Sequence, residues 1–430
     1  MGKILIVLLC ISLLDLNLVP ASLRAQEIPP NFDESKVPDY TLPDPLACSD
    51  GTRVSDATAW YEKRRPEILQ LFTEQVYGKA PGRTQNVRYS TTDSSLALNG
   101  LAIRKQVNLT LIQGQRELTI AVLLYLPTDQ ARPVPAFLGL NFNGNHSITD
   151  EPQIVLNPNW MRPNKENGIV DNHVTETSRG TAASRWPLQM ILKRGYAVVT
   201  AYYGDIDPDF DDGFQNGVHA LFQRPGQAAR ASDEWGSISA WAWGLSRIMD
   251  YLETDPEIDH QRVVVLGHSR LGKTALWAGA QDTRFAMVIS NDSGCGGAAL
   301  SRRCFGETVR AINESFPHWF CQNFKQYNGQ EDRLPVDQHL LLALIAPRPV
   351  YVASAQEDLW ADPRGEFLAL QNASPVYRLL DKEGLAEQMP AVNQPLIGTQ
   401  SYHIRSGKHD VTAYDWEQYL TWADRFLENR

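Results

Sequence analysis

The sequence predicts an α/β fold in which a mostly parallel β-sheet carries helices on both faces, as a three-layer sandwich. Two observations support this prediction. Strand-like and helix-like segments alternate along the chain, and several of the strand-like segments are continuous apolar runs. Continuous apolar runs are typical of parallel strands buried on both faces, and regular alternation is typical of a sheet covered by helices on both sides.

The spacing of apolar residues places the individual elements. Alternating apolar and polar residues over 101–107 and 118–126 predict antiparallel strands in the first part of the fold. Apolar runs predict buried strands at 136–142 and 197–203, and further strands are predicted at 262–266, 286–290 and 349–353. Apolar residues at helical spacing predict helices over 237–252, 274–280 and 416–427. Functional loops of such folds follow the carboxyl ends of the strands.

Length and composition are those of a folded globular protein. The chain has 430 residues, of which 43% are hydrophobic and 21% are charged, so it can bury a large core. Its formal net charge is -10 at pH 7, without clusters of Lys and Arg. Because binding to phosphates needs such clusters, we expect no nucleic-acid partner.

The first 25 residues have the pattern of a signal peptide. Lys3 precedes an apolar run over 4–14, and small residues occur near 21–25, where a signal peptidase would cut. Asp15 directly follows the apolar run, which is too short to span a membrane, since a span takes about 20 apolar residues. The pattern predicts export to the periplasm or the exterior, and no membrane contact after cleavage.

Two further segments follow the predicted signal peptide at 1–25. Residues 26–50 are rich in Pro, Asp and Leu without periodicity, which predicts an extended arm on the surface. Residues 51–430 are expected to form a single catalytic domain, and the protein is expected to be a monomer.

Four cysteines follow the predicted cleavage site, and they permit two disulfides in an oxidising compartment: Cys48, Cys295, Cys304 and Cys321. Their spacing identifies no partners and no metal-binding pattern. Free buried thiols are the alternative, because cysteine is often buried as a small apolar residue.

The strongest chemical signal is the segment VVVLGHSRLGKTAL at 263–276. A β-branched strand runs into Gly267, a tight turn with Ser269 at its apex, and a helix rich in Ala and Leu. This is the context of the nucleophile elbow of an α/β-hydrolase fold. The second glycine of the usual motif is Gly272, one position late. The alternative role for Ser269 is that of a helix N-cap.

A serine nucleophile needs a base, and the base needs a carboxylate that orients it. His409 lies in a polar loop just before the last predicted helix, which fits the order nucleophile, acid, base of α/β-hydrolases. His403 lies in an alternating, strand-like segment, so we expect it to be structural.

Two acids can orient His409. Asp358 follows the predicted strand at 349–353, and Asp292 follows the predicted strand at 286–290 in a glycine-rich loop. Both loops are expected at the same edge of the sheet, so the residues alone leave the choice open.

Several motifs together carry a resemblance to a known family. They are GHSRLGK at 267–273, NDSGCGG at 291–297, and the single residues Glu307, Trp360 and His409. Together they resemble the glucuronoyl esterases of carbohydrate esterase family 15, over most of the chain after the predicted arm. An Arg directly after the serine, with Gly-Lys two places later, is far more specific than a generic hydrolase serine.

The resemblance implies roles for these residues. The catalytic set would be Ser269 as nucleophile, His409 as base, Asp292 and Asp358 as acids, and Arg270 beside the oxyanion. The sugar-contacting set would be Lys273, Glu307 and Trp360.

At two positions the sequence departs from the family pattern. Much of the family has Glu as the acid at the position of Asp292, and other members have an acid at the position of Asp358. The two can therefore share the task, and we expect Asp292 to contribute and Asp358 to assist. Fungal-type members carry a disulfide-forming Cys before the serine, which His268 replaces, so that bridge is absent.

The chemistry of these side chains suits an acidic sugar ester. The Arg270 guanidinium keeps its charge and can stabilise an oxyanion, while an ordinary surface ion pair is the alternative. Lys273 lies one helical turn after Ser269, so its ammonium can meet sugar hydroxyls. Trp360 can stack on a pyranose ring, and a place in the core is the alternative. Three further tryptophans are expected to be packing residues: Trp235, Trp241 and Trp243.

The function predicted is hydrolysis of esters of glucuronic acid or its 4-O-methyl form, as in xylan–lignin links, with release of the uronate and an alcohol. The substrate would be derived from glucuronoxylan or be another uronate ester. No cofactor and no metal are expected. Two alternatives remain: another exported carbohydrate esterase of the acetyl xylan esterase type, and a non-catalytic carbohydrate-binding protein on a hydrolase scaffold.

Overall fold

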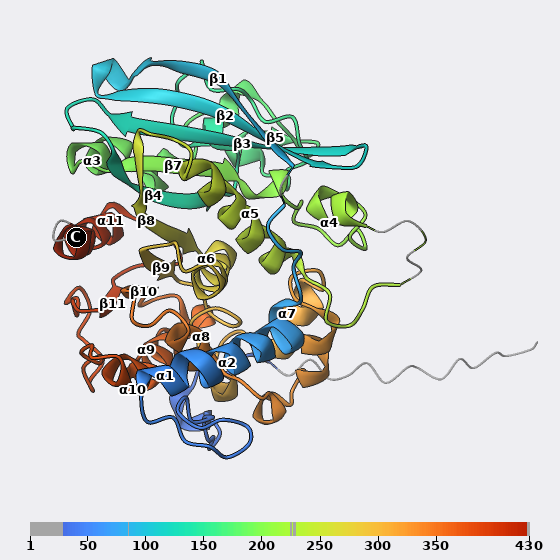
Figure 1. The fold of residues 1–430 in the computed structure, drawn as a ribbon, viewed down its shortest axis with the longest axis vertical. Helices are drawn as coiled ribbons and strands as arrows, with labels where there is room; N and C mark the ends of the chain where they lie inside the picture. The colour runs from blue at the N-terminus through green and yellow to red at the C-terminus, as the bar shows by residue number, and fades with distance from the viewer. Residues whose placement is uncertain (1–28, 85, 224–225, 227–228, 428–430) are drawn as a thin grey trace, which may run out of the picture. The chain divides into compact units, whose positions relative to one another are not determined.

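A nine-stranded β-sheet forms the centre of the computed structural model (Figure 1). The structure describes residues 29–84, 86–223, 226 and 229–427. The predicted signal peptide at 1–25 lies outside the described residues. The contacts within the chain group residues 31–430 into one unit, and the fold is that of this unit.

The strands follow one another across the sheet in the order β1, β2, β3, β7, β4, β8, β9, β10 and β11. Their bounds are Val87–Ala97 for β1, Ala102–Gln113 for β2, Arg116–Pro127 for β3, Val134–Asn141 for β4, Ala197–Tyr202 for β7, Ile258–His268 for β8, Met287–Asn291 for β9, Val350–Ala355 for β10 and Gln400–Arg405 for β11. β1, β2, β3 and β7 pair antiparallel, whereas every pair from β7 to β11 is parallel. A separate two-stranded ribbon joins β5 (Ile169–Val170) and β6 (His173–Val174).

Helices cover both faces of this sheet (Figure 1). Their bounds are Ala57–Ala59 for α1, Arg65–Phe72 for α2, Leu188–Lys193 for α3, Gly217–Phe222 for α4, Ser237–Leu252 for α5, Arg270–Gln281 for α6, Val309–Ser315 for α7, Gln338–Ala343 for α8, Pro363–Asn372 for α9, Ser374–Leu379 for α10 and Ala413–Leu427 for α11. Two π-helical turns, Trp60–Arg64 and Thr73–Tyr77, flank α2.

Alternate residues of β8 face two hydrophobic clusters on opposite sides of the sheet. Val263 and Val265 pack in the cluster that contains α5 and α6. Val264 and Leu266 pack in the cluster that contains α3 and α11. Because a strand projects successive side chains to opposite faces, a continuous apolar run is what a strand between two helical layers requires.

The predicted α/β fold is confirmed, and so are its main elements. The predicted helix over 237–252 coincides with α5, and every predicted strand overlaps an observed one. His403 lies in β11 and is buried, as expected for a structural residue. Trp235, Trp241 and Trp243 are also buried, which confirms their packing role.

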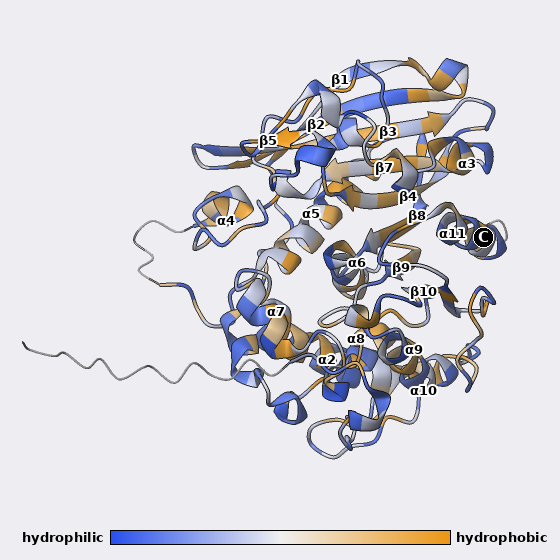
Figure 2. Ribbon diagram, turned by 180° about the vertical axis from the view of Figure 1, so that it is seen from behind, coloured by the Kyte–Doolittle hydropathy of each residue, from blue (hydrophilic) through white to orange (hydrophobic). Residues whose placement is uncertain are grey.

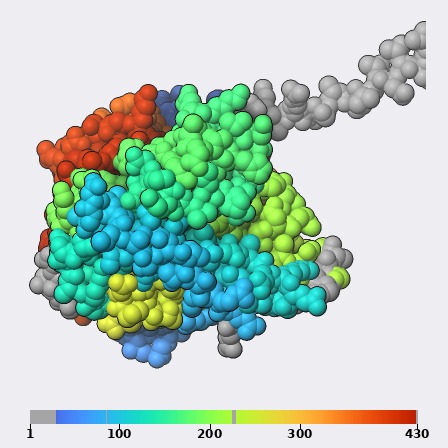
Figure 3. All heavy atoms as spheres, turned by 90° about the horizontal axis from the view of Figure 1, so that it is seen from above, coloured from blue at the N-terminus to red at the C-terminus, as the bar shows by residue number. Residues whose placement is uncertain are grey.

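The edge strand β1 was not predicted. Its sequence, VRYSTTDSSLA, is largely polar, and most of its residues are partly or fully exposed. By contrast, all residues of the central strand β7 are buried, and β7 has mostly hydrophobic colours in Figure 2. Seen from the side of β1, the surface is formed largely by the blue to green part of the chain, from β1 to β7 (Figure 3).

The described part of the predicted arm lies against the rest of the unit. The carbonyl of Asn31 accepts a hydrogen bond from Gly306 N–H at 2.8 Å, and Glu34 pairs with Arg303 at 2.6 Å. The boundaries at residues 25 and 50 stay predictions. All four cysteines after residue 25 are free thiols, so the disulfide alternative is not realised among the described residues. None of the described helices is both long and apolar enough to cross a membrane.

Candidate active site

Four of the candidate side chains follow the carboxyl ends of four neighbouring strands. Ser269 follows β8, Asp292 follows β9, Asp358 follows β10 and His409 follows β11. These four strands run parallel and side by side, so the loops after them meet at one edge of the sheet. The tertiary structure therefore gathers residues that are up to 140 positions apart in the sequence.

Ser269 occupies a sharp turn between β8 and α6. Its φ of 58° and ψ of -128° are a conformation that a residue other than glycine rarely adopts. Its backbone N–H donates to the carbonyl of Asn291 at 2.9 Å, which ties the turn to β9. Ser269 occupies the N-cap position of α6, but its side chain makes no capping hydrogen bond to the helix.

The two glycines around the serine allow this turn to close. A Cβ on Gly267 would lie 1.8 Å from the carbonyl oxygen of Leu271, and a Cβ on Gly272 would lie 2.9 Å from the Cβ of Ser293. The late second glycine therefore has a physical reason: α6 packs closely against the loop after β9 at the position of Gly272.

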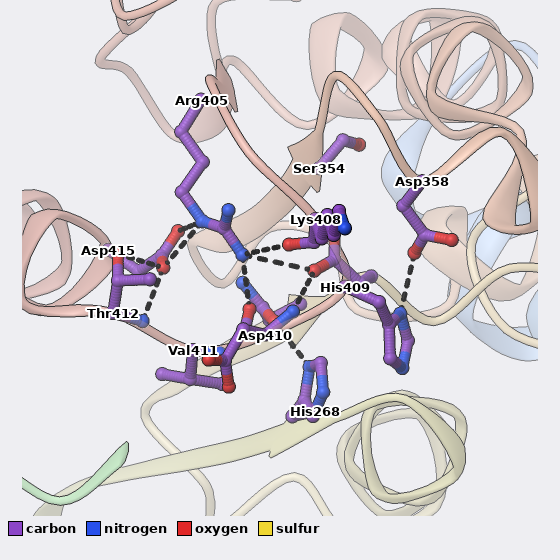
Figure 4. A network of polar contacts seen from close by, with 12 residues as sticks. His268, Ser354, Asp358, Arg405, Lys408, His409, Asp410, Val411, Thr412 and Asp415 are labelled. Atoms are coloured by element: carbon purple, nitrogen blue, oxygen red, sulfur yellow. Dashed lines mark hydrogen bonds and ion pairs between the residues drawn. The ribbon is translucent and has the colours of Figure 1, made fainter. Parts of the chain in front are cut away.

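His409 is held by Asp358. Its Nδ1–H donates to Asp358 Oδ2 at 2.6 Å, and the Asp358 side chain is only 7% exposed (Figure 4). A proton fixed on Nδ1 leaves the lone pair of Nε2 free to accept another proton, which is the state that a general base requires. Among the described residues, neither His409 Nε2 nor the Ser269 hydroxyl has a hydrogen-bond partner. Such hydrogen bonds often form only when substrate is bound.

Asp292 lies beside this pair without a hydrogen bond to the imidazole. Its Oδ2 is 3.4 Å from the backbone nitrogen of Asp410 and 3.5 Å from the guanidinium of Arg405. Its Oδ1 is buried and has no hydrogen-bond partner among the described residues. The structure thus brings both candidate acids near His409, but only Asp358 contacts it directly.

The electrostatic surroundings of Asp292 favour its neutral form. Burial raises the pKa of Asp292 well above its usual range, and the negative charges of Glu366 and Asp358 raise it further. The charge of Arg405 opposes this effect only in part. These surroundings therefore favour the protonated form of Asp292 more than water does.

Glu366, on α9, is a third buried carboxyl group at this edge. It accepts hydrogen bonds from the backbone N–H groups of Ser293 (2.8 Å) and Gly294 (2.9 Å) and from the Ser354 hydroxyl (2.5 Å). Burial raises the pKa of Glu366 to about 8, although these donors favour the ionised form. Glu366 therefore links the loop after β9 to the end of β10.

One oxygen or nitrogen from each of Asp292, Asp358 and His409 lies within 4.8 Å of the others. Three such groups could in principle hold a cation. The 2.6 Å hydrogen bond between His409 and Asp358 already uses two of them. We therefore interpret the cluster as an acid–base arrangement.

His268, the residue before the serine, is a neutral support. Its Nδ1 contacts Asn291 Oδ1 at 2.6 Å, and its ring centroid lies 4.4 Å from that of His409. Burial, together with the nearby His409, lowers the pKa of His268 well below its usual range. His268 also lines a small cavity of about 30 Å³, whose walls are mainly apolar and which is too small for a substrate.

Arg270 is fixed by a buried carboxylate, Asp209, with which it forms an ion pair. Asp209 is also hydrogen-bonded by the Tyr203 hydroxyl (3.0 Å), His318 Nε2 (2.9 Å) and Trp319 Nε1 (2.8 Å). Burial alone would raise the pKa of Asp209, but the hydrogen bond from His318 and the charge of Arg270 hold it well below its usual range. Asp209 is therefore an ionised anchor for the guanidinium.

Aromatic rings surround the same guanidinium. Its central carbon lies 4.8 Å from the ring centroid of Trp319, 5.5 Å from that of Phe316 and 5.8 Å from that of Phe142. These distances allow cation–π attraction. The alternative of an ordinary surface ion pair is wrong, because the carboxylate partner of Arg270 is fully buried.

The three predicted sugar-contacting residues lie close together. Lys273 Nζ donates to the carbonyl of Ser293 at 2.6 Å and is 3.5 Å from Glu307. Glu307 N–H donates to the carbonyl of Trp360 at 2.9 Å. Burial raises the pKa of Glu307, and the charge of Lys273 opposes this rise. Trp360 is 43% exposed, so the alternative of a core position for it is wrong.

Several residues of the site were missed from the sequence: Asp209, His318, Trp319, Glu366 and Arg405. A signal existed for Asp209, which lies in the acidic stretch at 205–209 directly after a predicted buried strand. The other four come from loops, a helix and a strand end, and no local pattern marks them.

Comparisons with known proteins agree with this geometry. A family model for fungal glucuronyl esterases matches residues 188–381. A carbohydrate esterase from an unknown prokaryotic organism is 54% identical over 398 residues, which cover 92% of each chain.

Solved structures give the same result for the whole fold. The chain is similar to a promiscuous CE15 esterase from a marine bacterial metagenome, with 54% identity and a TM-score of 0.88, over 93% of this chain and 100% of that one. It is also similar to a glucuronoyl esterase from Solibacter usitatus, with 48% identity and a TM-score of 0.87, over 91% of this chain and 100% of that one. The chain belongs to carbohydrate esterase family 15, the glucuronoyl esterases.

Proposed function

We propose that the protein is a serine esterase that hydrolyses esters of glucuronic acid or its 4-O-methyl form, and that it releases the uronate and an alcohol. The observation that carries this proposal is the hydrogen bond between His409 and Asp358 at the sheet edge that also presents Ser269. The glucuronoyl esterases among its relatives support the substrate class.

In the first step, the Ser269 hydroxyl attacks the carbonyl carbon of the ester and loses its proton to His409 Nε2. The bond that forms joins Ser269 Oγ to that carbon, and the carbonyl oxygen becomes an oxyanion. Asp358 stabilises the imidazolium that results, because its carboxylate accepts the Nδ1–H of His409.

The oxyanion is met by groups that are already oriented. The helix supplies no acceptor for the backbone N–H groups of Arg270 and Leu271 at the start of α6. The N–H groups of Gly272 and Lys273, by contrast, already donate to the carbonyl of Ser269. Arg270, which begins this helix, adds a guanidinium whose direction is set by Asp209. Because these donors are fixed before the reaction, they stabilise the developing charge without reorganisation.

The tetrahedral intermediate then collapses. The bond between the carbon and the alcohol oxygen breaks, and His409 returns its proton to the leaving alcohol. A water molecule attacks the remaining acyl-enzyme, again with His409 as base, and the uronate leaves as Ser269 regains its proton.

We assign the acid that orients His409 to Asp358, with Asp292 as a neighbour that makes no hydrogen bond to the imidazole. This reverses the expectation from the sequence, in which Asp292 contributes and Asp358 assists. The support is the direct hydrogen bond made by Asp358 and the raised pKa of Asp292. Asp292 can still take over part of the task if Asp358 loses its charge.

We assign recognition of the sugar to Lys273, Glu307 and Trp360. Lys273 and Glu307 form a buried, mutually neutralised pair that can exchange hydrogen bonds with sugar hydroxyls. Trp360 offers an exposed aromatic face for the apolar side of a pyranose. The same proposal includes three further points. The segment at 1–25 directs export to the periplasm or the exterior, the domain boundaries are those predicted from the sequence, and the protein is a monomer.

The test compares hydrolysis of benzyl glucuronate, benzyl galacturonate, p-nitrophenyl acetate and acetylated xylan by the wild-type protein and by Ser269→Ala. We expect the highest kcat/KM on benzyl glucuronate. Ser269→Ala should lower kcat by on the order of 10⁴- to 10⁶-fold, as for other serine hydrolases that lose a triad member.

A matched control is Ser55→Ala, which removes a hydroxyl from an exposed residue far from α6 in the sequence. It should retain full activity. Faster deacetylation of xylan than cleavage of benzyl glucuronate would reassign the protein to the acetyl esterases. No turnover by the wild-type protein on any of the four substrates would favour a binding function.

A further inference from the structure

The loop that carries His409 is folded around one buried guanidinium, that of Arg405 at the end of β11 (Figure 4). The Arg405 side chain is 4% exposed. Its Nη1 donates to the carbonyl of Ser406 at 3.1 Å, and its Nη2 donates to the carbonyls of Lys408 (3.0 Å) and Asp410. The last two carbonyls belong to the residues directly before and after His409.

The other side of the guanidinium is anchored in the core. Arg405 Nε lies 2.9 Å from Asp415 Oδ2 and 3.1 Å from Asp415 Oδ1. Asp415, in the first turn of α11, also accepts hydrogen bonds from the backbone N–H of Thr412 (2.7 Å) and from His403 Nε2 (2.8 Å). His403 Nδ1 is 2.9 Å from the Tyr351 hydroxyl. A chain of hydrogen bonds therefore connects the loop, through Arg405, Asp415 and His403, to Tyr351 in β10.

Arg405 also faces the two candidate acids. Its Nη2 lies 3.5 Å from Asp292 Oδ2, and among the described residues it is the only cation within ion-pair distance of that carboxyl group. The backbone carbonyl of Arg405 accepts a hydrogen bond from Gln356 N–H at 2.8 Å, two residues before Asp358. One residue thus connects the loop of the base with the loops of both acids.

We propose that Arg405 is a positioning residue for the reaction: its guanidinium holds the backbone on both sides of His409, so that the imidazole keeps its place against Asp358. The planar fork of arginine suits this task, since one group must reach three carbonyls and one carboxylate in different directions. Lysine has a single nitrogen and cannot satisfy all of these acceptors. The inference rests on the proposed roles of Ser269 and His409.

The two variants Arg405→Lys and Asp415→Asn test this proposal. Arg405→Lys keeps the charge but loses the fork, and Asp415→Asn keeps Arg405 but weakens its anchor. For Arg405→Lys we expect kcat to fall about 10²-fold on both benzyl glucuronate and p-nitrophenyl acetate, because a displacement of about 1 Å in a catalytic group has an effect of that size. KM for benzyl glucuronate should stay within about threefold, since no sugar contact changes. Asp415→Asn should show the same split with a smaller loss.

Arg348→Lys is the matched control. Arg348 is a partly buried arginine that also donates to three backbone carbonyls, those of Gly279, Asp282 and Phe285. It lies just before the amino end of β10, whereas His409 follows the carboxyl end of the neighbouring strand. We expect both Arg348→Lys and Arg405→Lys to lower Tm. Only Arg348→Lys should leave kcat within about threefold of wild type.

Two results would overturn the role of Arg405. One is a kcat within about threefold of wild type for both Arg405→Lys and Asp415→Asn. The other is an equal loss of kcat in Arg348→Lys. Failure of the proposed function looks different: the wild-type protein would then be inactive, or as active as Ser269→Ala, before any arginine is changed.

Discussion

At the scale of single residues, two aspartates near one imidazole differ in their contacts and surroundings. Asp358 contacts His409 at 2.6 Å, whereas Asp292 is buried beside Glu366 and Asp358, which raises its pKa well above the usual range. Surroundings that disfavour the carboxylate form of Asp292 weaken the charge stabilisation that it can give to an imidazolium. Distance and environment together, rather than the identity of the side chain, decide which acid serves the base.

We therefore expect Asp358→Asn to lower kcat far more than Asp292→Asn. Loss of the triad carboxylate has an effect of up to about 10⁴-fold in serine hydrolases. Asp292 makes no hydrogen bond to the imidazole, so Asp292→Asn should lower kcat by no more than about tenfold. The double variant should lose more than Asp358→Asn alone, because Asp292 can ionise and assist once Asp358 is neutral. Steady-state kinetics with benzyl glucuronate measure all three variants. A larger loss for Asp292→Asn than for Asp358→Asn would contradict our assignment.

At the scale of the secondary-structure elements, the turn between β8 and α6 depends on backbone space. Ser269 adopts a φ of 58°, and the turn closes only because Gly267 has no side chain. The conformation is held by the hydrogen bond to β9 and by the packing of α6 on β8 and β9. The strain of the serine is thus supported by the elements around it.

Gly267→Ala should disrupt this turn. The new Cβ would lie 1.8 Å from the carbonyl oxygen of Leu271, so α6 must shift. Overpacking of this kind destabilises by about 1–3 kcal/mol or more, and activity should fall with it. Gly82→Ala is the control, since a Cβ there has no atom within 4 Å, and its effect should stay within about 0.5 kcal/mol. Urea unfolding and kcat would be measured; equal stability of the two variants would refute the steric argument.

At the scale of the whole molecule, the buried carboxyl groups link stability to pH. Burial raises the pKa of Glu366 to about 8, so the folded protein binds a proton that the unfolded chain has already released above about pH 4.5. When the folded state binds more protons, the free energy of unfolding falls as pH rises. Glu366 therefore destabilises the fold progressively between about pH 4.5 and 8.

Glu366→Gln should remove this dependence, because Gln stays neutral and its carbonyl can still accept the N–H groups of Ser293 and Gly294. Between about pH 5 and 8, the free energy of unfolding of wild type relative to the variant should fall by up to about 1.4 kcal/mol per pH unit, the value for one proton. Urea denaturation over this pH range measures the slope. Parallel curves for the two proteins would show that Glu366 ionises in the fold as it does in water.

Much of the fold could be predicted because its central elements have local patterns. The apolar run at 262–266 and the helical spacing over 237–252 specify their elements directly. The edge strand β1 and the short helices around α8 could not be predicted, because a polar edge strand lacks the buried pattern and short helices form through packing rather than propensity.

The candidate site divides in the same way. By itself, the sequence determined the fold class, because strand-like and helix-like segments alternate along the chain. It also located the elbow serine with its following Arg and Lys, and the histidine before the last helix, because each lies within a short motif. Only the tertiary structure decided that Asp358 rather than Asp292 contacts His409, that Asp209 holds Arg270, and that Arg405 supports the loop of the base. Contacts between loops of different strands, and the pKa values that burial sets, depend on which residues the sheet brings together, and no local sequence pattern records that.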